Sequence, residues 1–103
     1  MIEFLKMLRL KNVERCEQVF HGVNEWMPWD WSNAMAGEVG EVCNLTKKML
    51  RGEEIDKSEV AKEIADVIIY ADLLAARLTI DLEDAIIKKF NEVSIKRGST
   101  IFI

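Results

Sequence analysis

The sequence predicts an all-α fold, an antiparallel helical bundle of four main helices within a single domain spanning residues 1–103. Three observations predict it. Apolar residues recur at helical spacing along most of the chain, and cap and stop residues divide the chain into four segments. Only residues 100–103 look strand-like. Because the connections are short, neighbouring helices are expected to run antiparallel.

The first two helices are expected to flank an aromatic loop. The first covers residues 12–23 or begins somewhat earlier, because its apolar residues share one face. The loop covers residues 22–32 and is punctuated by Pro28. The second helix is expected to begin near residues 30–32, where two residues can cap it, and to end at Gly52.

Both later helices carry an aspartate at their expected start. Asp56 opens a capping-box variant for a third helix, which runs to about Leu78. That helix is apolar nearly all round after Ile64, so it is expected to be central and buried. Asp81 caps the fourth helix, and Gly98 stops it.

Composition narrows the classes of function. The chain has 103 residues, a formal net charge of −4 and a pI of about 5.0, which argues against a nucleic-acid-binding protein. No signal peptide is apparent and the longest apolar run is too short for a bilayer, so a cytoplasmic protein without a membrane partner is expected. Cys16 and Cys43 are expected to be free thiols. A bundle this small leaves apolar surface uncovered, which favours a homodimer.

Two acidic pairs stand out in apolar helical surroundings. Glu38 and Glu41 lie on the second predicted helix, and Glu63 and Asp66 lie on the third. Spacing of i, i+3 puts each pair on one helix face. If the two faces meet, four carboxylates converge and need a cation to offset their repulsion. Mg²⁺ suits such an all-oxygen site, with Mn²⁺ as a substitute, whereas zinc is disfavoured because His21 is the only histidine.

Further residues could bind a substrate beside these carboxylates. Each also has a structural interpretation. A lysine can be a surface ion-pair partner, and the tryptophans of the loop can pack over the end of the helical bundle without binding a ligand. In the functional interpretation, the tryptophans form an aromatic wall for a nucleobase. The residues near the acidic faces are Trp31, Asn44, Lys48 and Tyr70. Lys88 and Asn91 on the fourth predicted helix are also spaced i, i+3, but this spacing alone indicates no function.

These motifs, in this order, resemble the signature of the MazG-like all-α nucleoside triphosphate pyrophosphohydrolases. Glu-x-x-Glu is followed after 21 residues by Glu-x-x-Asp. Residues 31–48 resemble the first motif helix of that family, residues 63–70 its second, and residues 88–98 its C-terminal motif. The resemblance extends over about residues 12–98, which is most of the chain.

The resemblance implies an enzyme that hydrolyses acid anhydrides, cleaving a (d)NTP to (d)NMP and pyrophosphate in nucleotide-pool house-cleaning. It implies that the four carboxylates hold Mg²⁺ and act in catalysis, with Glu41 or Glu38 orienting the attacking water. Lys48 and Lys88 would face the phosphates, Asn91 would bind phosphate or base, and Trp31 and Tyr70 would line the nucleoside pocket. Asn44 belongs to the same candidate substrate-binding set. Family assemblies are homodimers or dimers of dimers.

Two other interpretations stay open at this point. One is a phosphoribosyl-ATP pyrophosphohydrolase-like enzyme, which shares the acidic helices. The other is a non-catalytic helical module that binds nucleotides or serves in assembly. The resemblance does not fix the preferred base or sugar, the number of metal ions, or the roles of the first ten residues and the apolar tail.

Overall fold

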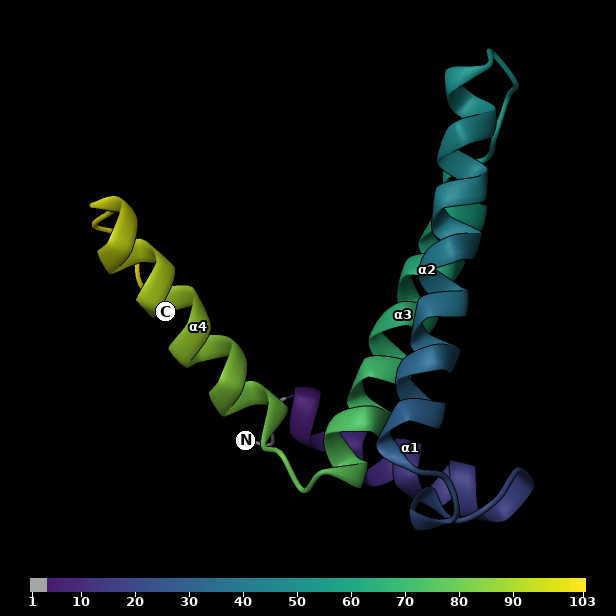
Figure 1. The fold of residues 1–103 in the computed structure, drawn as a ribbon. Coiled ribbons are helices and arrows are strands. Elements are labelled where there is room, and N and C mark those ends of the chain that lie inside the picture. Colours follow the sequence, from purple (N-terminus) through teal and green to yellow (C-terminus); the bar gives the residue numbers. More distant parts are fainter. Residues whose placement is uncertain (1–3) are drawn as a thin grey trace.

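A computed structural model describes residues 4–103 and shows an all-helical chain, which confirms the predicted fold class. No strand forms within this part of the chain, so the tail at residues 100–103, which looked strand-like in the sequence, does not pair in a sheet. α2 and α3 run side by side as a long antiparallel pair, α1 crosses one end of that pair, and α4 points away from it (Figure 1). The elements are α1 (Phe4–Val19), the 3-10 helix η1 (Val23–Glu25), α2 (Pro28–Leu50), α3 (Lys57–Arg77) and α4 (Leu82–Arg97).

The ends of α1 and α2 differ from the predicted ones. α1 is already helical at Phe4 and ends at Val19, so it lies further toward the N-terminus than residues 12–23. α2 begins at Pro28, which was expected to belong to the loop. Proline fits the first helical position, because its missing N–H would have no partner there. Asp30 then accepts a hydrogen bond from the backbone N–H of Met27 at 3.0 Å and closes the helix start.

The predicted starts of α3 and α4 are confirmed. The Asp56 carboxylate accepts a bond from the N–H of Ser58 at 2.9 Å, and Asp81 accepts one from Asp84 at 3.1 Å. Gly98 ends α4 in the left-handed conformation, with φ of 71°, which glycine adopts without steric cost. No helix among the described residues is long and apolar enough to cross a membrane.

The core is small and lies where α1, η1, α2 and α3 meet. Trp31 is 2% exposed and packs with Cys16, Val23 and Leu73. α3 contacts α1, α2 and η1, so its central position is confirmed. Its first half is not buried, however, because only α2 covers it there. Ile64 and Ile68 are consequently about half exposed, at 47% and 48%.

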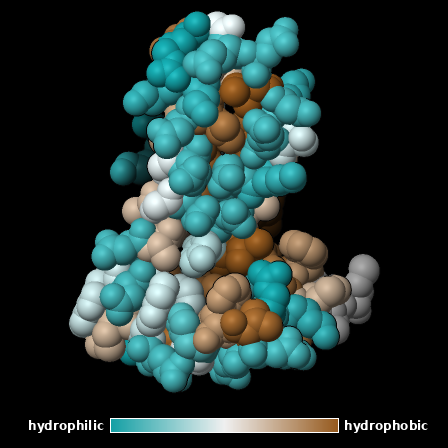
Figure 2. Space-filling view, turned by 90° about the vertical axis from the view of Figure 1, so that its right-hand side faces the viewer, coloured by the Kyte–Doolittle hydropathy of each residue, from teal (hydrophilic) through white to brown (hydrophobic). Residues whose placement is uncertain are grey.

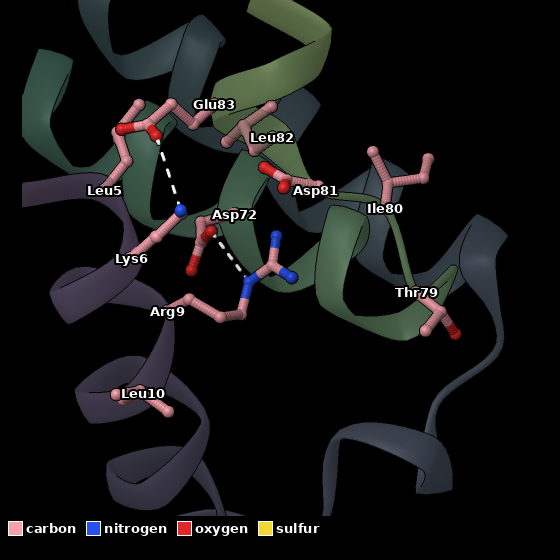
Figure 3. Close-up of a pocket in the computed structure, with 10 residues that line it drawn as sticks. All are labelled: Leu5, Lys6, Arg9, Leu10, Asp72, Thr79, Ile80, Asp81, Leu82 and Glu83. Carbon is pink, nitrogen blue, oxygen red and sulfur yellow. Dashed lines mark hydrogen bonds and ion pairs between the residues drawn. The ribbon is translucent and has the colours of Figure 1, made fainter. Parts of the chain in front are cut away.

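A buried carboxylate ties α1 to α3. Asp72 is 1% exposed and accepts hydrogen bonds from Arg9 Nε at 3.0 Å and from Asn12 Nδ2 at 3.1 Å. Figure 3 shows Arg9 reaching from α1 to Asp72, and Lys6 reaching to Glu83 at the start of α4. These polar contacts line a cavity of about 380 Å³ at the junction of the three helices. A buried charge needs such partners, so the cluster fixes how α1 crosses α3.

The single chain is open. Its radius of gyration is 16.2 Å, whereas a compact chain of this length would have about 13 Å. α4 packs mainly against α1 and leaves Ile86, Phe90 and Val93 exposed. Apolar side chains also reach the surface between polar ones on the face that Figure 2 shows. One copy therefore exposes much of the surface that a closed four-helix bundle would cover.

Thr79 in the α3–α4 connection has a strained backbone, with φ of 58°. A β-branched residue rarely adopts this left-handed conformation, whereas asparagine tolerates it. We expect Thr79→Asn to raise the free energy of unfolding by about 1 kcal/mol, measured by urea denaturation. Thr46→Asn, at an exposed helical position, is the matched control and should leave the midpoint nearly unchanged. Equal effects of the two substitutions would contradict the assignment of strain to Thr79.

Candidate functional site

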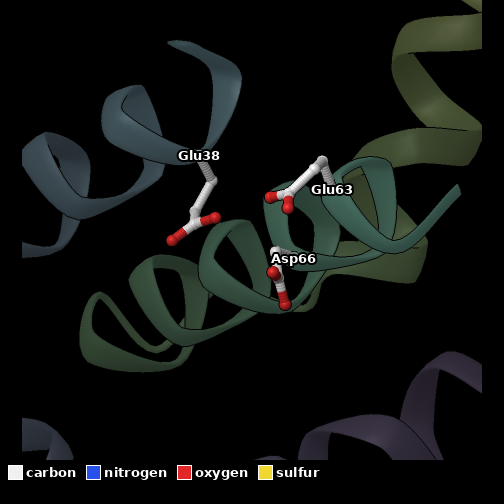
Figure 4. A group of neighbouring side chains, drawn as sticks. All are labelled: Glu38, Glu63 and Asp66. Carbon is white, nitrogen blue, oxygen red and sulfur yellow. The ribbon is translucent and has the colours of Figure 1, made fainter. Parts of the chain in front are cut away.

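Three of the four predicted carboxylates meet between α2 and α3. One carboxylate oxygen from each of Glu38, Glu63 and Asp66 lies within 4.8 Å of those of the other two. Figure 4 shows Glu38 pointing from α2 toward the two side chains on α3. All three are half-buried. The i, i+3 spacing on α3 puts Glu63 and Asp66 on one face, and the antiparallel packing of α2 brings Glu38 opposite them.

The cluster has uncompensated negative charge. Within residues 4–103, none of the three carboxylates forms an ion pair with a lysine or arginine. The pKa of Glu38 is raised above its ordinary value of 4.5 by partial burial first, and then by the charges of Asp66, Glu63 and Glu41. Half-buried carboxylates this close, without a cationic side chain, fit the oxygen ligand set of a hard divalent cation.

This raised pKa predicts a pH-dependent stability in EDTA. Because folded Glu38 binds its proton more tightly than unfolded Glu38, its stabilising contribution is complete below its ordinary pKa of 4.5 and is lost as the pH rises through the raised value. Glu38→Gln removes that loss. We therefore expect the difference in melting temperature, variant minus wild type, to grow as the pH rises from about 4 to about 7.

Melting curves followed by circular dichroism at several pH values check this expectation. The matched control is Glu59→Gln, which changes an exposed carboxylate on α3 outside the cluster. The control should show no comparable increase. A Glu38→Gln difference that stays constant with pH would contradict the role of carboxylate repulsion.

The remaining candidates on α2 lie further from the cluster. Glu41 is exposed and is not part of the three-carboxylate group, although its charge contributes to the raised pKa of Glu38. Asn44 is exposed and Lys48 is half-buried. At 1.5 Å per residue, Lys48 lies roughly 15 Å along the helix from Glu38. The structure does not bring Asn44 or Lys48 into contact with the carboxylates.

An aromatic cavity of about 310 Å³ adjoins the acidic cluster, and Asp66 belongs to both. The rings of Trp26 and Trp31 are 4.6 Å apart between centroids, His21 lies 4.6 Å from Trp26, and Tyr70 lies 6.3 Å from Trp31. Ring pairs at these separations form stable walls on which a flat heterocycle can stack. The cavity is lined by Asn12, Arg15, Cys16, Phe20, His21, Trp26, Trp31, Asp66, Ile69, Tyr70 and Leu73.

The three tryptophans near this loop have different environments. Trp31 is almost fully buried, and its indole N–H donates to the carbonyl oxygen of Val23 at 3.0 Å. It is therefore both a core residue and a wall of the cavity. Trp26 is half-buried, and its carbonyl oxygen accepts a hydrogen bond from Arg77 Nε at 2.7 Å. Trp29 is 61% exposed and does not line the cavity.

Lys88 and Asn91 lie on α4, which points away from the acidic cluster in one chain (Figure 1). Lys88 pairs with Asp84 at 2.9 Å, and this hydrogen bond raises its pKa. The Asn91 amide exchanges two hydrogen bonds with the backbone of Ile103, at 2.9 and 3.0 Å. The apolar tail therefore folds back along α4, and within one copy the structure does not bring these two residues to the carboxylates.

Sequence reasoning missed several polar residues around the cavity. Asn12 and Arg15 line it from α1, and Asp72 anchors Asn12 from α3. Asp72 has the clearest signal in the sequence, because a charged residue in the most apolar helix needs a buried partner. Nothing in the spacing singles out Asn12, since its role depends on how α1 crosses α3.

Together, the fold and the site define an all-helical protein with a carboxylate cluster beside an aromatic cavity. No family model matches the chain. The chain is distantly similar to dCTP pyrophosphatase 1 from Homo sapiens, with 29% identity over 93 residues that cover 80% of this chain and 55% of the relative. The proteins of the same name from Rattus norvegicus and Mus musculus are 29% identical over 107 aligned positions, covering 87% of this chain and 63% of each relative. The chain thus spans less than two thirds of the length of these relatives.

Proposed function

We propose that this chain is a Mg²⁺-dependent nucleoside triphosphate pyrophosphohydrolase that releases pyrophosphate and a nucleoside monophosphate. The observation that carries the proposal is the convergence of Glu38, Glu63 and Asp66 next to an aromatic cavity, with Asp66 common to both. A metal-bound triphosphate and a stacked base need these two environments side by side. The similarity to proteins named dCTP pyrophosphatase supports the same proposal.

In the proposed reaction, Glu38, Glu63 and Asp66 hold the cation, and Glu41 adds negative charge from the same helix. Bound Mg²⁺ supplies Lewis-acid polarisation of a phosphate oxygen. Glu41 or Glu38 orients a water molecule and takes its proton as the water oxygen attacks phosphorus at the α–β anhydride. The bond to the bridging oxygen breaks, and pyrophosphate leaves with the electron pair. This chemistry serves nucleotide-pool house-cleaning in the cytoplasm.

The base is proposed to stack in the aromatic cavity, against Trp31 and Tyr70. The indole of Trp31 is fixed by its bond to Val23, so it offers a rigid surface. Lys48 is proposed to reach phosphate oxygens through its long side chain, and Asn44 to contact the substrate from the exposed side of α2. Either residue would have to approach the cluster when the substrate binds.

We also propose that the chain works as a homodimer or dimer of dimers. α4 carries an apolar groove of about 600 Å³ lined by residues that include Ile86, Phe90 and Val93. Ile64 and Ile68 on α3 are likewise about half exposed. Packing α4 of one copy on the α2–α3 pair of another would bury both apolar faces. Lys88 and Asn91 lie on α4 outside this groove, and we propose that they contact the substrate from a neighbouring copy.

A pyrophosphate-release assay tests the proposed activity. The canonical ribo- and deoxyribonucleoside triphosphates, together with phosphoribosyl-ATP, are compared with Mg²⁺, with Mn²⁺ and with EDTA. We expect equal amounts of monophosphate and pyrophosphate, only when the metal is present, and dCTP is the first substrate to examine. Absence of metal-dependent turnover on every substrate would refute the proposal.

Light scattering at micromolar concentration tests the assembly. We expect a mass of at least twice the 11.9 kDa of the single chain. Phe90→Asp places a charge in the α4 groove and should lower both the mass and the turnover, because the second copy would no longer complete the site. Lys6→Ala, on α1 outside the groove, is the matched control. A monomeric wild type with full activity would contradict this assembly.

A further inference from the structure

The amide of Asn12 is held in one orientation. Asn12 is 3% exposed, and its Nδ2 donates to the carbonyl oxygen of Ile69 at 3.0 Å and to Asp72 Oδ2 at 3.1 Å. Neither acceptor can donate, because one is a backbone carbonyl and the other a carboxylate paired with Arg9 at 3.0 Å. If the amide were rotated by half a turn, Asn12 Oδ1 would face the Ile69 carbonyl oxygen and Asp72 Oδ2, and the three acceptors would have no proton to share. Both N–H groups are therefore committed, and only Oδ1 remains to bind another group.

This oxygen belongs to a residue that lines the aromatic cavity. Among the residues that the structure describes, no donor pairs with Asn12 Oδ1. Every fully buried side-chain oxygen or nitrogen in this part of the chain has a partner, so Asn12 Oδ1 keeps some exposure rather than being sealed in the core. Asn12 and Arg15 line the aromatic cavity and also a second cavity of about 370 Å³. Asn12 thus carries a hydrogen-bond acceptor that lacks a partner and whose orientation the fold determines.

A donor lies one helical turn further along α1. Arg15 lines the same cavity, is exposed, and forms no ion pair with any residue in 4–103. Spacing of i, i+3 sets Arg15 beside Asn12 on one face of α1. Two residues that line the aromatic cavity therefore carry one fixed acceptor and one adjustable donor, and the walls of that cavity include Trp26, Trp31 and Tyr70.

We propose that Asn12 Oδ1 faces the aromatic cavity and selects the base of the substrate by accepting a hydrogen bond from an exocyclic amino group, so that cytosine is preferred over uracil and thymine. Cytosine carries an N4 amino donor where uracil and thymine carry an O4 acceptor. With cytosine, Oδ1 gains a partner and Arg15 can donate to the ring acceptors. With uracil, O4 faces Oδ1, and two acceptors without a proton between them repel. This inference rests on the proposed function and adds the residue that discriminates between substrates.

The fixed orientation is essential to this selectivity. An asparagine free to rotate its amide would offer either an acceptor or a donor and would accept both bases. Here Asp72 and Ile69 prevent that rotation, so selection against uracil depends on a carboxylate buried outside the cavity. Asp72 is accordingly a positioning residue, and Asn12 is the residue that touches the base.

Substrate analogues test the proposal without changing the protein. Turnover of dCTP, of dUTP and of the 2-pyrimidinone analogue of dCTP, which lacks the amino group, is compared as kcat/KM with Mg²⁺. We expect a loss of roughly tenfold for the analogue, which only forgoes the hydrogen bond, and of roughly a hundredfold for dUTP, which also opposes two acceptors. Equal kcat/KM values for the three substrates would overturn the proposal.

A pair of variants then assigns the preference to Asn12. In Asn12→Ala the ratio of kcat/KM for dCTP over dUTP should fall to about one, because the fixed acceptor is gone. Arg9→Ala is the matched control, since it loosens the same buried cluster but does not line the cavity. It should lower the melting temperature and keep the ratio. Retention of the wild-type ratio in folded Asn12→Ala would overturn the proposal.

Binding of the monophosphates separates this inference from the proposed activity. dCMP and dUMP are titrated while the fluorescence of the cavity tryptophans is followed, which requires no turnover. Tighter binding of dCMP, lost in Asn12→Ala, supports the role of Asn12 even if no triphosphate is cleaved and the proposed enzyme activity fails. Equal affinities for dCMP and dUMP, in a protein that does cleave triphosphates, overturn the role of Asn12 alone.

Discussion

Asp66→Asn is expected to reduce Mg²⁺-dependent pyrophosphate release by at least roughly a hundredfold without unfolding the protein. Asp66 is a member of the carboxylate cluster and also lines the aromatic cavity, so it lies where the triphosphate and the nucleoside would join. The substitution keeps the shape of the side chain and removes its charge. It should therefore weaken cation binding and leave the packing of α3 unchanged.

Stability without metal provides a second readout for this variant. Removing one of three neighbouring negative charges relieves repulsion, so in EDTA Asp66→Asn should melt no lower than wild type. Mg²⁺ should raise the melting temperature of wild type through preferential binding to the folded state and should raise that of the variant less. Glu59→Gln, on the same helix but outside the cluster, should behave as wild type in both assays. Full turnover of Asp66→Asn would refute the proposed metal site.

Trp31→Ala is expected to have the largest effect on stability, a loss of about 3–5 kcal/mol in the free energy of unfolding. The ring is 2% exposed and is the largest fully buried side chain among the described residues. Alanine would leave a cavity at the junction of α1, α2 and α3, and the carbonyl oxygen of Val23 would lose its donor. A domain of this size has a total stability of the same order, so we expect a partly unfolded protein at 37 °C.

Chemical denaturation followed by far-UV circular dichroism measures this loss. Trp29→Ala is the matched control, because that ring lies nearby but is 61% exposed and should change the unfolding free energy by less than about 0.5 kcal/mol. Trp31→Phe keeps most of the ring and deletes the indole donor. It should cost roughly 1–3 kcal/mol, since an acceptor loses its partner. Similar stabilities of Trp31→Ala and Trp29→Ala would contradict the place of Trp31 in the core.

The sequence predicted the features that depend on local spacing. The helix starts at Asp56 and Asp81 and the end at Gly98 follow from side chains acting on the nearest backbone groups, and all three are confirmed. Glu38 can face α3 whenever α2 and α3 pack as antiparallel neighbours. Helices joined by a short connection commonly pack in this way. Local rules therefore predicted three members of the acidic cluster, whereas Glu41, which the same spacing included, lies outside it.

Features that depend on the crossing of distant segments were beyond such reasoning. Arg9 and Asn12 meet Asp72 across 63 and 60 residues of sequence, and no periodicity marks that meeting. The placement of α4 was likewise not predictable, because its apolar face finds no complete partner within one copy. Asn91 shows the same limit, since its partner in this structure is the backbone of the tail rather than any group of the acidic site.

The sparse attachment of α4 has a consequence for how the molecule unfolds. α4 packs mainly against α1 and is joined to α3 through strained Thr79, so its detachment exposes little additional apolar surface. Backbone amides of α4 should therefore exchange with deuterium through local opening, at a lower free energy than those of the α2–α3 pair, whose opening requires global unfolding. If a second copy covers α4, the amides of α4 should exchange about as slowly as those of the α2–α3 pair. The remaining difference between the two exchange rates would then measure the fraction of unassembled chains.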